Sequence, residues 1–388
     1  MKFALPPKLS SAQLKSIARL CGKSRSGTKA VIADRITEDL KTFQPLAQGT
    51  RVLSIDLGIR NLAYSLLEVP HPNDGLPSKT TKGSRKKETV PSSAAPIGPR
   101  LLAWERLALI PKANKVVAPI AKTKKSRRKT KEDDEDNTDQ KDEEVPTKKS
   151  RRKTKTDGAT TTPGHQADED PTAEASPSTT PVLVEDFSPA RLSAVAVDLV
   201  LNRLLPFRPD VVIMEQQRFR QTGGSGVYEW TLRVNSLESM LYAALTLLRK
   251  LGRWDSPLGR IEPVVARNVL EFMGVRERLA GHDVGDIWAR HRGADDKTDN
   301  KKIKKDIIGR TLASGEGLVV EEPARFVAAE YLDEWQGKKN FQRKADRMKK
   351  LDDLADCLLQ GLAFIHWQNN KRVLLERGVD ALQDQMVE

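Results

Sequence analysis

The stretch RVLSIDLG at residues 51–58 decides the fold, because it reads as a buried strand that ends on an acid and a glycine turn. A second run, VVIME at residues 211–215, has the same form and also ends on an acid. A third acidic segment, LDDLADCLL at residues 351–359, has the spacing of a helix. Carboxylates in such apolar company are costly to bury unless a positive group meets them. We therefore expect the three segments to converge on cations.

The segments around these runs predict an α/β fold with a mixed sheet. Three consecutive strands are expected at residues 51–57, 60–68 and 100–109, and two later ones at 210–215 and 260–266. Helices are expected at 188–205, 228–251, 267–280 and 301–314, with a final helical region at 323–377. An antiparallel meander followed by β-α-β units predicts a five-stranded sheet flanked by helices.

The composition favours a polyanionic partner. The chain has 388 residues, with 66 Lys and Arg against 53 Asp and Glu, and a formal net charge of +13. Such an excess favours nucleic acid or an anionic membrane surface. No apolar run approaches the roughly 18 residues that span a bilayer, which argues against an integral membrane protein. Cys21 and Cys357 lie far apart and suggest a reducing compartment without a disulfide framework.

Residues 9–43 are predicted to form two helices joined by a turn at Gly22. Basic residues crowd this unit, and Lys15, Arg19 and Lys29 are its candidate DNA contacts. The pattern resembles a SAP-type DNA-binding motif. An ordinary basic helical hairpin is the alternative interpretation.

A low-complexity tract interrupts the chain between the third strand and the next helix. The nonamer TKKSRRKTK occurs at residues 123–131 and again at 147–155, with an acidic block between the copies. Little in this tract can be buried, so we expect disorder. The nonamers fit DNA binding or nuclear import, and a solvated, self-neutralising insertion is an equal alternative. The expected organisation is a SAP-like module at 1–48, the α/β domain at 49–110 and 182–375, an insertion at 111–181 and a tail at 376–388.

Three motifs in order carry a family resemblance. They are SIDLGIRN at residues 54–61, IMEQQRFR at 213–220 and KKLDDLAD at 349–356. Together they resemble the fungal mitochondrial Holliday-junction resolvases, relatives of the bacterial RuvC resolvases within the ribonuclease-H-like nucleases. The similarity covers about 1–68, 100–110 and 185–370; the insertion departs from the compact family pattern. The resemblance implies a ribonuclease-H-like sheet, cleavage of junction DNA and a homodimer.

The candidate catalytic and metal-binding residues are acids from all three motifs. Asp56 ends the first strand and is the natural candidate to bridge two Mg²⁺ ions, and Glu215 ends the strand expected beside it. Asp353 and Asp356 are three residues apart and share a helix face. Asp352 lies four residues before Asp356 and shares a face with it equally well; the Asp-x-x-Asp match favours Asp353. Each acid alone has a structural alternative, as a turn residue, a strand-end acid or a partner of nearby lysines.

Further basic residues near these acids are candidate DNA contacts. They are Arg218, Arg220, Lys304, Lys305, Lys349 and Lys350. A solvated helix face is the alternative for any one of them.

The resulting hypothesis is a Mg²⁺-dependent endonuclease that resolves four-way DNA junctions by paired symmetric nicks. It would use two metal ions per site, with Mn²⁺ able to substitute, and no nucleotide cofactor or membrane. The two-fold symmetry of a junction favours a homodimer with two matched sites. A non-catalytic junction-binding or DNA-binding protein and an actin/Hsp70-like ATPase are the rival hypotheses.

The sequence carries two opposing localisation signals. The first 33 residues hold seven Lys or Arg and no Asp or Glu, a composition that resembles a transit peptide. Together with the family resemblance, this predicts the mitochondrial matrix. The repeated basic nonamers make the nucleus the alternative.

Overall fold

The computed structural model describes residues 5–6, 8–70, 98–110, 185–217, 229–282, 296–338 and 351–386, without the side chains of 296–299. The chain divides into two units, residues 1–112 with 185–388, and residues 113–184, and the described residues belong to the first. The insertion and the glycine-rich loop at 222–226 lie outside the described residues, as do four candidate DNA contacts: Arg218, Arg220, Lys349 and Lys350.

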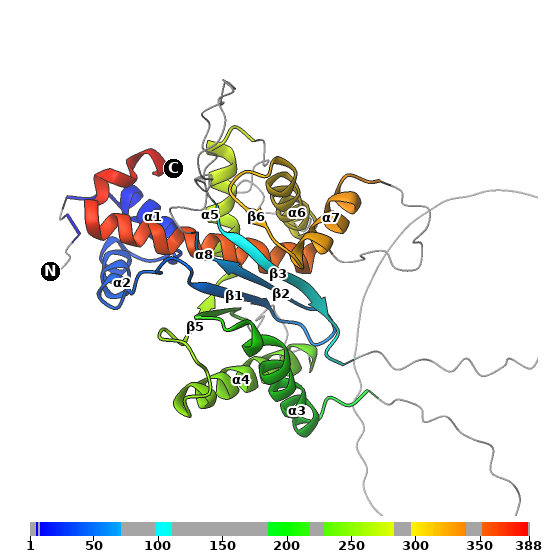
Figure 1. The fold of residues 1–388 in the computed structure, drawn as a ribbon. Coiled ribbons are helices and arrows are strands. Elements are labelled where there is room, and N and C mark those ends of the chain that lie inside the picture. Colours follow the sequence, from blue (N-terminus) through cyan, green and yellow to red (C-terminus); the bar gives the residue numbers. More distant parts are fainter. Residues whose placement is uncertain are drawn as a thin grey trace, which may run out of the picture. The chain divides into compact units, whose positions relative to one another are not determined.

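A mixed sheet forms the centre of this unit (Figure 1). Its strands are β1 (Arg51–Asp56), β2 (Leu62–Glu68), β3 (Arg100–Leu107), β4 (Val211–Glu215), β5 (Arg260–Val264) and β6 (Val319–Val320). Their order is β5-β4-β1-β2-β3-β6. Strands β1, β2 and β3 pair antiparallel, whereas β4 pairs parallel with β1, and β5 parallel with β4. This is the arrangement predicted for a ribonuclease-H-like sheet, so the fold class is confirmed.

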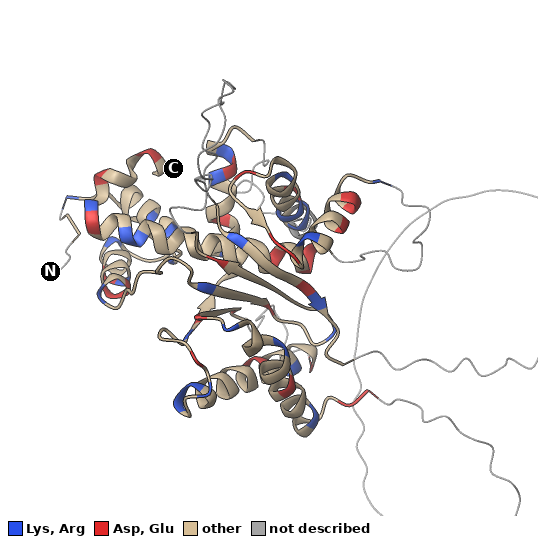
Figure 2. Cartoon of the chain, in the orientation of Figure 1, with Lys and Arg blue, Asp and Glu red and all other residues tan. Residues whose placement is uncertain are grey.

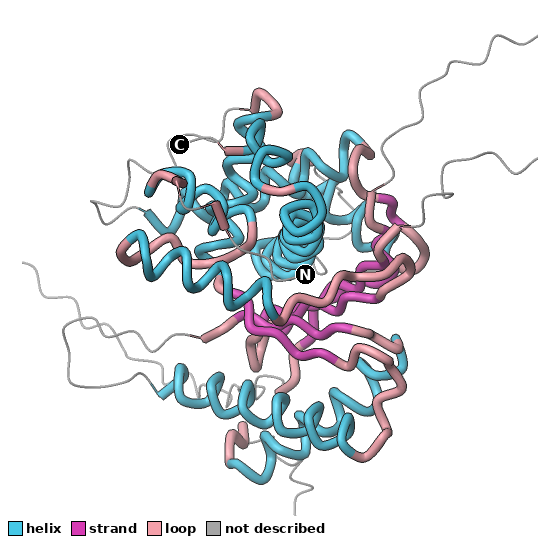
Figure 3. Tube along the Cα trace, turned by 90° about the vertical axis from the view of Figure 1, so that its left-hand side faces the viewer, coloured by secondary structure: helices cyan, strands magenta, loops and turns pink. Residues whose placement is uncertain are grey.

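Helices cover both faces of the sheet (Figure 3). One face packs against α3 (Pro189–Leu199) and α4 (Glu229–Lys250), and its core includes Leu53 and Ile55 of β1. The opposite face packs against α5 (Ala266–Leu279), α6 (Asp296–Ser314), α7 (Ala324–Trp335) and α8 (Leu351–Arg377). Because side chains alternate along a strand, Asp56 lies on the same face as the buried Val52, toward α8.

Helix α8 packs tightly against the middle of the sheet. A Cβ atom at Gly361 would lie 2.6 Å from Leu67 Cδ1 and 3.3 Å from Ser54 Cβ, so the close approach requires glycine here. Three side chains also bridge helix and sheet. The Ser65 hydroxyl donates to the Cys357 carbonyl at 3.1 Å, the Trp104 indole to the Leu354 carbonyl at 3.1 Å, and the Gln360 amide to the Ile55 carbonyl at 3.4 Å. These bonds fix the helix position over β1, β2 and β3.

The N-terminal hairpin consists of α1 (Ser11–Leu20) and α2 (Lys29–Lys41). Ser10 and Gln13 form a capping box at α1, as expected of a serine preceding a helix. The apolar faces of both helices join the same core as α8 and α5. Polar contacts support this packing: the Asn370 amide donates to the Leu20 carbonyl at 2.9 Å, and Lys371 Nζ lies 2.8 Å from an Asp39 carboxylate oxygen.

Several details differ from the sequence prediction. The sheet has six strands rather than five, because the two-residue β6 adds to β3; so short a strand carries no periodic signal. The helical region predicted at 323–377 contains two described helices, α7 and α8. The predicted helix at 188–205 ends at Leu199 and continues as a π-helical turn and then a short 3₁₀ segment. Residues Val379–Gln385, predicted as part of a tail, form a 3₁₀ helix with Leu382 buried.

Within the described ranges, no helix is both long and apolar enough to cross a membrane. Both cysteines are buried free thiols.

Candidate active site

The ends of β1 and β4 bring two of the predicted acids to one edge of the sheet. Ile55 pairs in register with Met214, so Asp56 and Glu215 follow at equivalent positions on adjacent parallel strands. Adjacent strands are about 4.8 Å apart. Both acids also share the α8 face, since each lies an even number of residues from a strand residue of that face, Val52 or Val211. Strand pairing alone therefore places the two carboxylates side by side.

The first turns of α8 bring Asp353 and Asp356 to the same place. The pKa of Asp56 is raised well above the ordinary aspartate value, first by burial and then by the negative charges of Glu215, Asp356 and Asp353. The pKa of Asp356 is also raised, again mainly by burial. Four acids from three distant segments thus lie within electrostatic reach of one another, and they carry more negative charge than their surroundings compensate.

Lys304 of α6 supplies a positive charge to this cluster. Its Nζ lies 2.6 Å from Asp356 Oδ1, and the two side chains are 17% and 23% exposed. Burial lowers the pKa of Lys304, but Asp356, Glu215 and Asp56 outweigh that effect, and the net shift is upward. Lys304, predicted as a DNA contact, is thus a counterion of the acids. Sequence periodicity carries no signal for this pairing, because it depends on how α6 packs on α8.

Asp352 lies differently from its neighbours. Its Oδ2 is 2.5 Å from Nζ of Lys301, a largely exposed lysine of α6. Asp353, by contrast, contributes to the raised pKa of Asp56. Two ion pairs therefore join α6 to α8, an outer one at Lys301 and an inner one at Lys304. Figure 2 shows the basic residues of α6 beside the start of α8.

A divalent cation suits this donor set in kind and in charge. Carboxylate oxygens are the ligands that Mg²⁺ and Mn²⁺ prefer, and burial together with the neighbouring acids raises the pKa of Asp56, so a nearby cation would favour its ionised form. Among the described residues, the side chains do not close into a group of three or more ligands around one point. The acids that raise the pKa of Asp56 are Glu215, Asp356 and Asp353, whereas Asp352 pairs with Lys301 and raises the pKa of Asp356.

The other predicted DNA contacts lie in two places. Lys15 and Lys29 are exposed on the N-terminal hairpin. Arg19 is only 3% exposed, and its Nη2 donates to the Gln385 carbonyl at 3.3 Å, so it faces the protein interior rather than the surface. Lys305 is half-buried on α6, where its carbonyl accepts from the Tyr331 hydroxyl at 3.2 Å.

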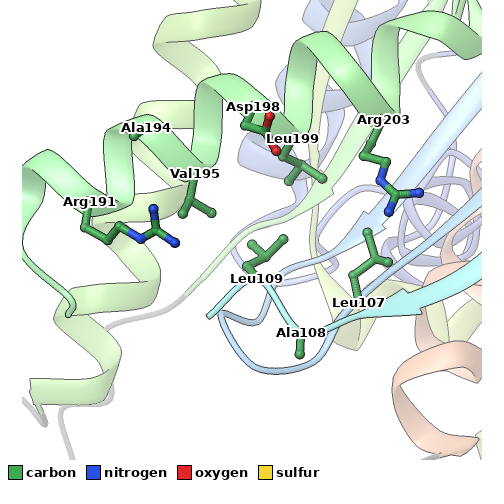
Figure 4. A pocket seen from close by; sticks show the side chains of 9 residues that line it. All are labelled: Leu107, Ala108, Leu109, Arg191, Ala194, Val195, Asp198, Leu199 and Arg203. Carbon is green, nitrogen blue, oxygen red and sulfur yellow. The ribbon is translucent and has the colours of Figure 1, made fainter. Parts of the chain in front are cut away.

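A separate cavity of about 400 Å³ lies between α3 and the end of β3 (Figure 4). Leu107 and Leu109 line one side of it, and Arg191 and Arg203 lie near its ends. Asp198 sits between the two arginines, and among the described residues it is the only acid that lines the cavity. This cavity therefore supplies no part of the carboxylate cluster.

Known proteins resemble this chain over different lengths. The mitochondrial cruciform cutting endonuclease 1 of Schizosaccharomyces pombe (strain 972) is 27% identical over 184 residues, which is 47% of this chain. The chain spans 60% of the length of that relative.

Two solved structures are also similar. The crystal structure of the yeast mitochondrial Holliday junction resolvase Ydc2 has 18% identity and a TM-score of 0.49, covering 96% of this chain and 98% of that one. Thermus thermophilus RuvC has 14% identity and a TM-score of 0.28, covering 82% and 96%. Since both scores are under 0.5, the fold assignment rests on the strand order.

A protein-family model covers most of the chain. The family described as mitochondrial resolvase Ydc2 / RNA splicing MRS1 matches residues 52–374, a range that includes the four clustered acids and all of the sheet except Arg51. The chain therefore belongs to the mitochondrial resolvase Ydc2 / RNA splicing MRS1 family.

Proposed function

We propose that this chain is a divalent-metal-dependent endonuclease that resolves four-way DNA junctions by paired symmetric nicks. The observation that carries the proposal is the meeting of three segments at one edge of the sheet: Asp56 and Glu215 end adjacent paired strands, and α8 is bonded to the Ile55 carbonyl beside them. The pKa of Asp56, raised first by burial and then by Glu215, Asp356 and Asp353, supports it. Family membership and the +13 net charge support the same conclusion. The relative's name, cruciform cutting endonuclease, describes this kind of substrate.

The acids would hold two Mg²⁺ ions, with Mn²⁺ as a substitute. Asp56, Glu215, Asp353 and Asp356 would be the residues that hold them. When bound, the ions would polarise the scissile phosphate and make water a nucleophile at neutral pH. Lys304 would keep the inner carboxylates compensated before the ions bind, since its Nζ already lies 2.6 Å from Asp356. The Trp104 and Ser65 bonds to α8 would hold the acids in place against the sheet.

A homodimer would present two such sites to the two-fold symmetric junction. A candidate surface for it is formed by α3 with the π-helical turn that follows it and by the C-terminal end of α4, where exposed apolar side chains lie: Val197, Leu201, Leu247 and, directly after α4, Leu251. The relative's name contains the word mitochondrial, which supports a mitochondrial location for this chain. We propose the matrix as the compartment, with the nucleus as the alternative.

A cleavage assay tests the proposal. A synthetic four-way junction and a linear duplex of the same sequence are incubated with the purified chain in Mg²⁺, Mn²⁺ or EDTA. We expect symmetric nicks in the junction only, and only with metal. Asp56→Asn should bind the junction without cutting it, whereas the exposed Asp255→Asn should cut like the wild type.

Two results would reject the proposal. Undiminished cutting by Asp56→Asn would show that Asp56 is not needed for cleavage. Binding without cutting under every metal condition would favour a non-catalytic nucleic-acid-binding role, a possibility kept open by the words RNA splicing in the family description. ATP turnover without DNA would instead support the ATPase alternative.

A further inference from the structure

A second charged cavity lies between the N-terminal hairpin and α5. Its volume is about 610 Å³. The hairpin contributes Lys15, Ser24, Arg25 and Ser26, and the start of α5 contributes Val265, Arg267, Asn268 and Glu271. Three cations and two hydroxyls around one acid give the cavity a net positive lining.

One buried carboxylate holds two of these cations. Glu271 is 7% exposed. Its Oε2 is 3.1 Å from Nε of Arg25, and its Oε1 is 2.8 Å from Nε of Arg267. One negative charge therefore fixes two arginines that come from different parts of the fold. The side chain of Arg267 remains 57% exposed, so it is open to a ligand from solvent.

Hydrogen bonds fix the loop on the hairpin side. Arg35 Nη1 donates to the Ser24 carbonyl at 2.5 Å and to the Ser26 carbonyl at 3.1 Å. The Asn268 amide donates to the Gly22 carbonyl at 3.0 Å, which ties the loop to α5. The cavity walls are thus held in place without a ligand, which lowers the cost of binding.

The surroundings add to the positive potential. Burial and the positive charges of Arg25 and Arg278 lower the pKa of the neighbouring Arg19 to about 10, although Glu271 opposes the shift. Arginine side chains that crowd around a single carboxylate favour an anion with several oxygen acceptors, such as a phosphate.

The sheet places this cavity on the same edge as the acids. Val264 pairs in register with Glu215, and Asp56 follows Ile55 at the end of the next strand. Helix α5 starts two residues after Val264. Two strand spacings, about 10 Å in all, separate the end of β5 from that of β1. A DNA strand rises about 3.4 Å per nucleotide, so about three nucleotides span these strand ends, and the cavity lies just past the end of β5.

We propose that this cavity binds backbone phosphates of the same DNA strand that reaches the carboxylate site, with Glu271 as a positioning residue for Arg25 and Arg267. The inference rests on the proposed function for its substrate. It makes the N-terminal hairpin and α5 one composite DNA-binding surface rather than two independent ones.

The test measures junction affinity by fluorescence anisotropy in EDTA, at several salt concentrations, with the full chain. Arg25→Ala/Arg267→Ala should bind the junction about tenfold or more weakly, and the log–log salt slope should become shallower by about 1–2, the value for one or two lost phosphate contacts. Arg25→Lys/Arg267→Lys should recover most of the slope. Inorganic phosphate at millimolar concentration should weaken wild-type binding more than chloride of equal ionic strength.

A double variant with the same charge change is the control. Arg325→Ala/Arg372→Ala removes two exposed arginines, each paired with an acid three or four residues away. We expect its affinity to stay within about threefold of the wild type. If Arg25→Ala/Arg267→Ala does not fold, Arg267→Ala alone serves, because its side chain is mostly exposed, and its slope should fall by about 1.

The outcomes separate the two proposals. A folded double variant with wild-type affinity and salt slope would overturn the phosphate cavity, whether or not the wild type cuts junctions. A wild type that cuts nothing, combined with weakened binding by the double variant, would uphold the cavity and reject the nuclease. Phosphate that competes no better than chloride would also count against the cavity.

Discussion

The carboxylate cluster and the arginine cavity have opposite charge excess along one edge of the same sheet. At the cluster, Asp356, Glu215 and Asp56 act on one lysine, Lys304. At the cavity, Arg25, Arg267 and Lys15 surround one buried acid, Glu271. Lys304 is the single counterion at the cluster, and Glu271 is the single counterion at the cavity. Each carries one charge, so neither neutralises all of the opposite charges around it. The first arrangement suits metal cations and the second suits phosphate, which are the two things that a metal-dependent nuclease must hold close together.

The largest expected effect is a difference in cleavage rate between variants of two acids of α8, Asp356 and Asp352. Asp356→Asn should slow junction cleavage by on the order of 10²-fold or more, as when an electrostatic contact to the reacting charge is lost. Asp352→Asn should stay within about threefold, because Lys301 already holds Asp352 aside at 2.5 Å. Single-turnover rates with saturating Mg²⁺ measure both. Equal losses would mean that both acids serve the metal.

The packing of α8 gives the next effect. Glycine to alanine inside a helix stabilises by about 0.5–1 kcal/mol, but a Cβ at Gly361 would lie 2.6 Å from the buried Leu67 Cδ1. Overpacking costs about 1–3 kcal/mol, so packing should win and Gly361→Ala should lower the free energy of unfolding. Urea denaturation checks this, with the exposed Asn369→Ala of the same helix as control. A stabilised Gly361→Ala would show that α8 sits farther from the sheet.

A smaller effect distinguishes the two lysines of α6. In EDTA, Lys304→Met should destabilise by about 1–2 kcal/mol, because it leaves half-buried acids without their counterion. Lys301→Met should cost at most about 1 kcal/mol, since its pair is exposed. Mg²⁺ should restore much of the loss in Lys304→Met if cations replace the ammonium charge. Thermal melts with and without Mg²⁺ give the comparison, and equal losses with no rescue would contradict it.

The smallest effect concerns the charge of Asp56. Its folded-state pKa is raised above the ordinary 3.8 by burial and by neighbouring acids, so its ionisation costs stability as pH rises from about 3.8 through the raised value. In EDTA at neutral pH, Asp56→Asn should therefore be more stable than the wild type, by up to about 1 kcal/mol. The gain should vanish toward pH 4. A gain that persists there would have a cause other than charge.

The sequence predicted what depends on local pattern. Strands ending on Asp56 and Glu215, a helix with Asp353 and Asp356 on one face, and two N-terminal helices joined at Gly22 all follow from periodicity and turn rules. The burial of Arg19 and the pairing of Lys304 with Asp356 could not be predicted from the sequence, because both depend on which helices pack together. Glu271 shows a local signal, an Arg at i−4, but its second partner, Arg25, is distant in the chain.

The most direct test of the central claim measures metal binding itself. Calorimetric titration of Mn²⁺ into the metal-free chain should show two ions per wild-type chain. Asp56→Asn should lose at least one of them or bind about tenfold or more weakly, as expected when a shared ligand is removed. Asp255→Asn should match the wild type. If the wild type and Asp56→Asn took up Mn²⁺ with the same number and affinity, the four acids would not form the metal site, and the account would be contradicted.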